Sequence, residues 1–113
     1  MKTDLTQLDR LTMLMMTEKS DVIVKRTDRE PTFDGRRYLI HNERHDLVIK
    51  TKDGEYLWDA ICHPGSYGYE EGLLEVMGDP VVSPNALDSV EGYLTADEIF
   101  ARWQKWEAEH GKV

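Results

Sequence analysis

Apolar residues near the N-terminal end of the chain recur at every third or fourth position. Leu5 and Leu8 begin this stripe, and the spacing predicts an amphipathic helix over residues 4–17. Asp4 and Gln7 are placed to form a capping box at its start. Three methionines make the end of this helix apolar nearly all round, which favours a helix packed on a sheet. The alternative is a methionine-rich groove for a partner, or a seam between two copies of the chain that would make a homodimer.

A second helical pattern lies at the C-terminal end. Thr95 and Glu98 are spaced as a capping box, in which each residue's side chain accepts from the other's backbone amide. The apolar spacing continues to about residue 109, and Gly111 follows as a stop signal. We therefore expect a helix over 95–109 that buries Trp103 and its apolar neighbours on one side.

Between the two helices, apolar residues alternate with others or stand in short blocks, a pattern typical of strands. Strands are expected at 22–24, 37–42, 46–51, 56–63 and 90–94. We expect the second and third of these to pair as a hairpin, with the two histidines beside its turn in solvent. The third and fourth are joined by Asp53-Gly54, which favours a type I′ turn. Segment 28–35, with Pro31 and Gly35, is predicted to be a loop.

The strand at 56–63 contains the residue types that most often carry chemistry. Its alternation places Trp58 and Cys62 on a core face, and Asp59 and His63 on the opposite face. Cys62 is interpreted as a small buried hydrophobe rather than a nucleophile, because it lies on the apolar face.

A short helix is expected after this strand, over Tyr69–Met77, where apolar residues return to helical spacing and Gly78 follows as a stop. Gly68 and Gly72 weaken this prediction, because glycine inside a helix costs about 1 kcal/mol relative to alanine. The predicted fold class is α+β: an antiparallel sheet of three to five strands packed against the N-terminal and C-terminal helices, with one short extra helix.

The chain has 113 residues, of which 40% are apolar, and this suits one compact domain over 1–113. Its net charge of −8 is unevenly spread. Residues 19–52 carry nine Lys and Arg against six Asp and Glu, whereas residues 53–113 carry three against thirteen. The acidic C-terminal half disfavours nucleic acid as a partner, because phosphates would be repelled there.

Compartment and cofactor signals are few. No apolar run approaches the roughly 20 residues that cross a bilayer, so no membrane partner is expected. With a single cysteine and no secretory leader pattern, the expected location is cytoplasmic. No phosphate-binding glycine motif and no recognised metal-ligand spacing is present, so the prediction is no cofactor and no metal.

Two tyrosines and three acids after the 56–63 strand form the first candidate site, a contact surface for a protein partner. Glycines around the tyrosines allow close approach of a backbone, and amphipathic rings beside acids make good contact anchors. The candidate binding residues are Tyr67, Tyr69, Glu70, Glu71 and Glu75. The alternative is that one or both rings simply cover the edge of the sheet.

Asp59 and His63 form the second candidate site, for acid/base work or a divalent metal. Four strand residues span roughly 13 Å, so these two side chains cannot meet along the strand alone. His63 would need a carboxylate from the following segment, Glu70, Glu71 or Glu75. The competing interpretation is a structural histidine that orders the turn after the strand.

Two blocks of the C-terminal half, DAICHPGSYGYEEGLLEVMG and SVEGYLTADEIFARW, resemble segments of small uncharacterised proteins encoded by bacterial phages and mobile elements. The resemblance implies no activity, cofactor or catalytic residue. It implies a context, because many small acidic phage proteins bind and inhibit host proteins, including restriction and CRISPR nucleases.

These observations lead to one functional hypothesis and one rival. The hypothesis is a non-enzymatic protein-binding module of a phage or mobile element, of which an inhibitor of a host protein is one form. The rival is a small metal-dependent or acid/base enzyme that uses His63 with nearby carboxylates. The sequence does not name the protein partner.

Overall fold

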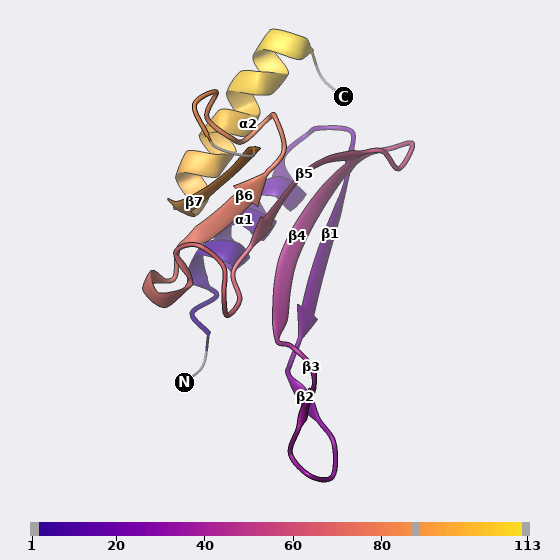
Figure 1. Cartoon of the computed structure of the whole chain (residues 1–113). Helices are drawn as coiled ribbons and strands as arrows, with labels where there is room; N and C mark the ends of the chain where they lie inside the picture. The colour runs from indigo at the N-terminus through magenta and orange to yellow at the C-terminus, as the bar shows by residue number, and fades with distance from the viewer. Residues whose placement is uncertain (1–2, 87–88, 112–113) are drawn as a thin grey trace.

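Helices lie at both ends of the chain and strands lie between them in this computed structural model, which describes residues 3–86 and 89–111 (Figure 1). The elements are α1 (Thr6–Thr17), β1 (Val22–Arg29), β2 (Thr32–Phe33), β3 (Leu39–His41), β4 (Arg44–Thr51), β5 (Tyr56–Ile61), the 3-10 turn η1 (Tyr69–Glu71), β6 (Leu74–Met77), β7 (Val90–Leu94) and α2 (Ala96–His110).

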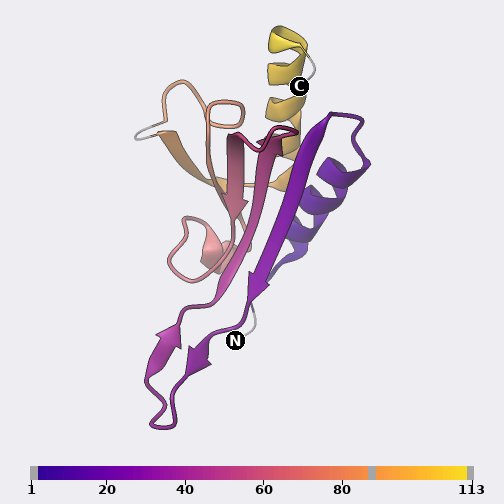
Figure 2. The same ribbon diagram turned by 90° about the vertical axis from the view of Figure 1, so that its right-hand side faces the viewer.

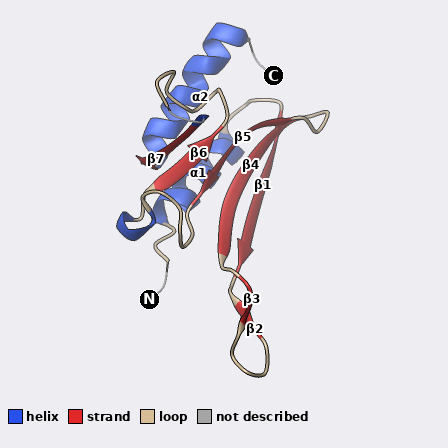
Figure 3. Cartoon of the chain, viewed as in Figure 1, coloured by secondary structure: helices blue, strands red, loops and turns tan. Residues whose placement is uncertain are grey.

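Five strands form one antiparallel sheet in the order β1-β4-β5-β6-β7, and both helices lie against one face of it (Figure 3). This arrangement confirms the predicted α+β class. The described residues contain no helix with the length and apolar character that a bilayer crossing requires.

The core lies between the two helices and the covered face of the sheet. Trp58 of β5 meets Trp103 of α2 at its centre, with ring centroids 6.0 Å apart. The helices and strands around this pair contribute Leu8, Leu11, Met15, Leu47, Ile49, Ala60, Cys62, Leu74, Val76, Leu94 and Ile99, all buried. The predicted alternation from Trp58 to His63 is confirmed, because Trp58, Ala60 and Cys62 are buried while Asp59 and His63 are on the other face. Tyr56, predicted on the core face, is instead 49% exposed and its hydroxyl donates to Asp59.

One of the two predicted capping boxes forms. The Thr95 side chain accepts from the Glu98 amide, and the Glu98 carboxylate accepts from the Thr95 amide. At α1 the box is wrong, because the N-cap is Leu5 and the Gln7 side chain instead accepts from the amide of Ala96, 2.8 Å away. Gln7 therefore ties the start of α2 to α1.

The predicted hairpin between 37–42 and 46–51 is also wrong. β4 pairs along its whole length with β1, from Val22 opposite Thr51 to Arg29 opposite Arg44. Segment 28–35 is therefore not simply a loop. Beyond the end of β1 the chain continues outward, turns, and returns as β3 paired with β2.

The predicted helix over Tyr69–Met77 is reduced to the single turn η1, and Leu74–Met77 is a strand. Gly68 and Gly72 flank η1 in the left-handed conformation, at φ 93° and 69°, which a helix interior does not contain. After Gly72 the buried residues alternate, so Leu74 and Val76 face the core as strand residues do.

The turn between β4 and β5 forms where the Asp-Gly pair predicted it, but it is not of type I′. Gly54 has φ 90°, whereas Asp53 is not among the residues with positive φ. The Thr51 amide donates to the Glu55 carbonyl at 2.7 Å and the Gly54 amide to the Thr51 carbonyl at 2.9 Å. One left-handed glycine is enough for this wider turn.

The β2–β3 hairpin projects from the sheet as an arm, which we define as residues 30–43. Figure 2 shows it as a narrow extension beyond the ends of β1 and β4, away from both helices. With this extension the molecule measures 52 Å along its longest axis and 29 Å and 24 Å along the others.

Candidate functional site

The arm exposes large apolar side chains that no part of the core covers. Four of them, Phe33, Tyr38, Leu39 and Ile40, are each more than half exposed. Phe33 and Leu39 are cross-strand partners in the β2–β3 ladder, so two of these side chains lie next to each other. Clustered exposed apolar residues of this kind mark interaction sites on soluble proteins.

Hydrogen bonds at the arm tip fix its turn. One carboxylate oxygen of Asp34 accepts from the amides of Arg36 and Tyr38, at 2.8 and 3.0 Å. The Asp34 backbone completes the turn by donating to the Tyr38 carbonyl and accepting from the Arg37 amide. This aspartate turn supports Arg37 in a left-handed conformation at φ 67°. The arm therefore has a defined turn although it has no core of its own.

Two arginines lie at the tip of the arm. Arg36 and Arg37 are exposed at the tip. Within the described part of the chain, neither guanidinium forms an ion pair. Both charges are available to carboxylates of another molecule.

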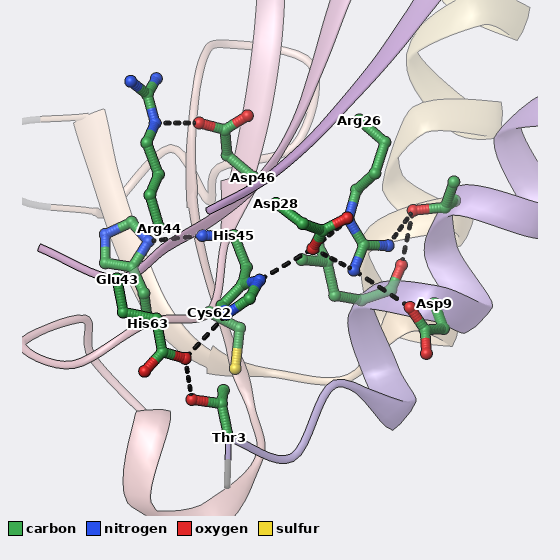
Figure 4. A network of polar contacts seen from close by, with 12 residues as sticks. Thr3, Asp9, Arg26, Asp28, Glu43, Arg44, His45, Asp46, Cys62 and His63 are labelled. Carbon is green, nitrogen blue, oxygen red and sulfur yellow. Dashed lines mark hydrogen bonds and ion pairs between the residues drawn. The ribbon is translucent and has the colours of Figure 1, made fainter. Parts of the chain in front are cut away.

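A charged network ties the base of the arm to α1 and the sheet (Figure 4). Its centre is His45 at the start of β4, which is 3% exposed. One ring nitrogen lies 2.8 Å from the Asp28 carboxylate and the other 2.7 Å from the Glu43 carboxylate. Arg26 extends the network from Asp28 to Asp9 of α1. The expectation of a solvated turn histidine is wrong at this position.

The two carboxylates that flank His45 are held in their charged form. Thr3 donates to Glu43 and is the main cause of its lowered pKa, to which His45 adds. Burial works against the charge of Asp28, but hydrogen bonds and charges from His45 and Arg26 outweigh it and lower its pKa. Both carboxylates lie within hydrogen-bond distance of the same imidazole ring. The network therefore joins Glu43, His45 and Asp28 side by side at the base of the arm.

A cavity of about 490 Å³ lies where the arm leaves the sheet, on the face without helices. We call it the base cavity. Its lining residues are Arg29, Asn42, Glu43, Arg44, Asp46, Val48, Asp59, Ile61, His63 and Pro64. They come from the ends of β1 and β5 and the beginning of β4, so the curvature of the sheet forms the hollow.

Asp59 and His63 both line the base cavity, although they lie too far apart along the strand to meet directly. Burial is the main cause of the raised pKa of Asp59, and the nearby charges of Asp46 and Glu75 add to it. The Tyr56 hydroxyl donates to Asp59, and burial together with that contact raises the pKa of the phenol. His63 accepts from the amide of His45 at 3.3 Å, which uses one ring nitrogen for structure.

The tyrosine group after β5 forms a second exposed surface, together with a residue that the sequence did not suggest. Tyr67 and Tyr93 are 61% and 58% exposed, and both line a cavity of about 250 Å³ with Glu70 and Glu71. Gly92 allows β7 to approach Tyr67 closely, because a Cβ atom at position 92 would lie 2.2 Å from the Cβ of Tyr67. We call this the tyrosine surface.

The other predicted contact residues have different surroundings. Tyr69 packs against the core, and its hydroxyl lies 3.3 Å from the Thr3 hydroxyl. Glu70 and Glu71 are exposed on η1. The Glu75 carboxylate accepts from the Tyr67 amide at 2.9 Å, so it orders the loop that carries Tyr67.

Three other predictions concern the first helix, the cysteine and metals. Met15 is buried, whereas Met13 and Met16 are exposed on α1, and a homodimer through them stays a prediction. Cys62 is fully buried, and burial raises the pKa of its thiol. Over residues 3–86 and 89–111, no three or more His, Cys, Asp or Glu side chains are grouped to hold a metal ion.

The comparisons with known proteins give no relative. No protein-family model matches this chain, and neither do the curated proteins or the solved structures.

Sequence reasoning missed the arm, Tyr93 and the buried pair His45-Asp46. One signal for the arm was available: Tyr38, Leu39 and Ile40 are consecutive apolar residues directly after two arginines. A run of that kind leaves no polar face for solvent, so either the core or a partner must cover one side. His45 and Asp46 gave no such signal, because their burial depends on contacts from distant segments.

Proposed function

We propose that this protein is a non-enzymatic protein-binding module of a bacterial phage or mobile element, and that its arm holds the partner. The phage context rests on the resemblance of the C-terminal half, and inhibition of a host protein is the form of the function which that context implies. The observation that carries the proposal is the exposure of four large apolar side chains on a projecting, internally hydrogen-bonded arm.

The geometry of the arm supports binding rather than folding as its role. Its apolar side chains add little to the stability of the protein, because they remain mostly in water. A partner that covers them gains the free energy of apolar burial without having to order the tip, since Asp34 already fixes it. Aromatic and arginine side chains are also the types most often found at the energetic centre of interfaces.

The arm defines the chemistry of the partner. An apolar groove would accept Phe33, Tyr38, Leu39 and Ile40, and carboxylates at its end would meet Arg36 and Arg37. A second copy of this chain is the competing occupant, because its acidic half could also attract the arm. The size of the bound species distinguishes the two.

The test is affinity capture of the tagged protein from bacterial host lysate, with the wild type and a Tyr38→Ser/Leu39→Ser variant. The expected result is a stoichiometric partner that the wild type retains and the variant loses. Since both side chains are more than half exposed, the free energy of unfolding should change by less than about 0.5 kcal/mol per substitution. Retention of the same partner by this variant would overturn the proposal.

The tyrosine surface provides the matched comparison. A Tyr67→Ala/Tyr93→Ala variant also removes two exposed aromatic side chains, but from a surface that does not include the arm. If the arm is the main contact, this variant keeps the partner with at most a modest loss of affinity. If only this variant loses the partner, the contact surface is the one that the sequence predicted, Tyr67 with Glu70 and Glu71.

One observation favours a second candidate function, acid/base catalysis in the base cavity. Asp59, whose pKa is raised, and His63 line the same hollow. A carboxyl group with a raised pKa keeps its proton to a higher pH than an ordinary aspartate, which suits a general acid. A hydrolytic activity of the purified protein that Asp59→Asn and His63→Ala both abolish, without loss of folding, would favour this function over binding.

A further inference from the structure

The base cavity is lined by an aspartate, Asp46, one of whose carboxylate oxygens has no hydrogen-bond donor among the described residues. Asp46 is 2% exposed, and one of its oxygens accepts from the Arg44 guanidinium. The other oxygen, Oδ1, is buried and has no hydrogen-bond partner among the described residues. A buried acceptor without a donor is costly, so native proteins normally supply one from protein, water or ligand.

A second carboxylate lies beside it on the neighbouring strand. Asp46 of β4 is paired with Ile61 of β5, and Val48 is paired with Asp59, so the two aspartates are diagonal neighbours on the open face. Diagonal pairs of this kind have Cβ atoms up to about 7–8 Å apart. Among the described residues, the Tyr56 hydroxyl donates to one oxygen of Asp59 and no donor meets the other.

Around Asp59, the carboxylates of Asp46 and Glu75 add negative charge, and the nearby Arg44 does not balance all of it. Burial is the main reason why the pKa of Asp59 is raised, and the charges of Asp46 and Glu75 raise it further, while the hydrogen bond from Tyr56 and the charge of Arg44 oppose them. Arg29, the other cation of the cavity lining, donates its Nε–H to the Asn42 carbonyl, 3.0 Å away. A further cation between the two aspartates would satisfy Oδ1 and offset the excess charge.

We propose that the base cavity binds the guanidinium group of an arginine supplied by the protein partner. A guanidinium is planar and carries N–H donors on opposite edges, so it can bridge two carboxylates that are too far apart to touch. The cavity lies at the root of the arm, where β1 ends at Arg29 and β4 begins at Arg44, so a partner seated on the arm would reach it. This inference rests on the proposed function in one respect, namely that the arginine comes from the protein partner.

The test uses N-acetyl-arginine amide as a probe, titrated into ¹⁵N-labelled full-length protein and followed by amide chemical shifts. N-acetyl-citrulline amide, which has nearly the same shape without the charge, is the matched control. We expect saturable shifts around Asp46 and Asp59 with the arginine probe at millimolar concentration and none with citrulline. Equal shifts with both probes, or no saturable shift up to about 50 mM, would overturn the inference.

Charge-matched variants localise the probe. Asp46→Asn should weaken its binding about tenfold or more, as expected for loss of a charge-assisted hydrogen bond. Glu109→Gln removes the same charge from the exposed end of α2 and should leave the affinity unchanged. Asp59→Asn, at a less buried position, should also weaken binding and replaces Asp46→Asn if that variant does not fold. Unchanged affinity in a folded aspartate variant would contradict the site.

The arm variant separates this inference from the proposed function. Tyr38→Ser/Leu39→Ser should bind the arginine probe as the wild type does, because neither side chain lines the cavity. If the probe fails while partner capture still depends on the arm, the cavity proposal is wrong and the binding function stands. If the probe binds but the arm variant keeps its partner, the cavity proposal stands and the arm is not the binding element.

Discussion

The body and the arm of this protein use the same residue types in opposite ways. In the body, apolar side chains from both helices and the sheet meet around Trp58 and Trp103 and are closed to water. In the arm, Phe33, Tyr38, Leu39 and Ile40 are carried outward by extensions of β1 and β4 and remain in solvent. The body derives its stability from burial, whereas the arm derives its shape from hydrogen bonds at Asp34.

This difference separates the residues that keep the protein folded from those that we propose bind the partner. Apolar side chains of the body cannot be changed without a loss of folding free energy, and those of the arm can. The base cavity and the His45 network lie at the border between the two regions, where the sheet ends and the arm begins. Changes at that border should therefore affect stability and binding together.

The largest expected effect comes from a matched pair of leucines. Leu47→Ala in β4 removes a fully buried side chain and should lower the free energy of unfolding by about 2–5 kcal/mol. Leu39→Ala in the arm is the same chemical change at a position 51% exposed and should stay within about 0.5 kcal/mol. Urea denaturation followed by tryptophan fluorescence measures both. Similar losses would show that the arm packs against the body in solution.

A matched pair of glycines should give the next largest effect. Gly78 has φ 113°, and a Cβ atom there would lie 2.6 Å from the Leu57 carbonyl oxygen, so Gly78→Ala should cost at least about 1–3 kcal/mol. At Gly35, in the arm, no atom lies within 4 Å of such a Cβ atom. Gly35→Ala should therefore be nearly neutral or slightly stabilising. Thermal unfolding of the two variants checks the difference.

The border region should respond to acid. Asp28 and Glu43 have lowered pKa values in the folded protein, so their contribution is complete above the unfolded-state values of about 4. This contribution to stability is lost as the pH falls below that range, because the protonated carboxyl groups no longer accept hydrogen bonds from His45 as carboxylates do. His45→Gln should therefore lose less stability than the wild type between about pH 5 and pH 3. Parallel losses in chemical denaturation would show that the network does not couple to folding.

The sequence predicted the parts of the fold that depend on local pattern. The helix over 95–109, its capping box and the core face of β5 follow from spacing within one segment. The pairing of β4 with β1 did not, because strand register is decided by contacts between segments that the periodicity of either strand leaves open. The helix predicted over Tyr69–Met77 failed for a similar reason, since Leu74 and Val76 satisfy a strand pairing as well as a helical stripe.

The candidate sites could be predicted only in part. Tyr67, Glu70 and Glu71 do lie together on the surface, and Asp59 and His63 do line one cavity. Tyr93 joins the first group through β7, and Asp46 joins the second through β4, both from distant parts of the chain. The sequence predicted a loop over 28–35 and a hairpin of 37–42 with 46–51 where the arm forms, because the pattern of one strand does not show which other strand it pairs with.

The most direct test of the arm as the binding element is photo-crosslinking in bacterial host cells. Tyr38 on the arm and Met16 on α1 are both 70% exposed, so p-benzoylphenylalanine placed at either position samples its surroundings equally. We predict a covalent adduct with one host protein from position 38 and none from position 16. Adducts from position 16 alone, or an adduct from position 38 with the mass of two copies of this chain, would contradict the account.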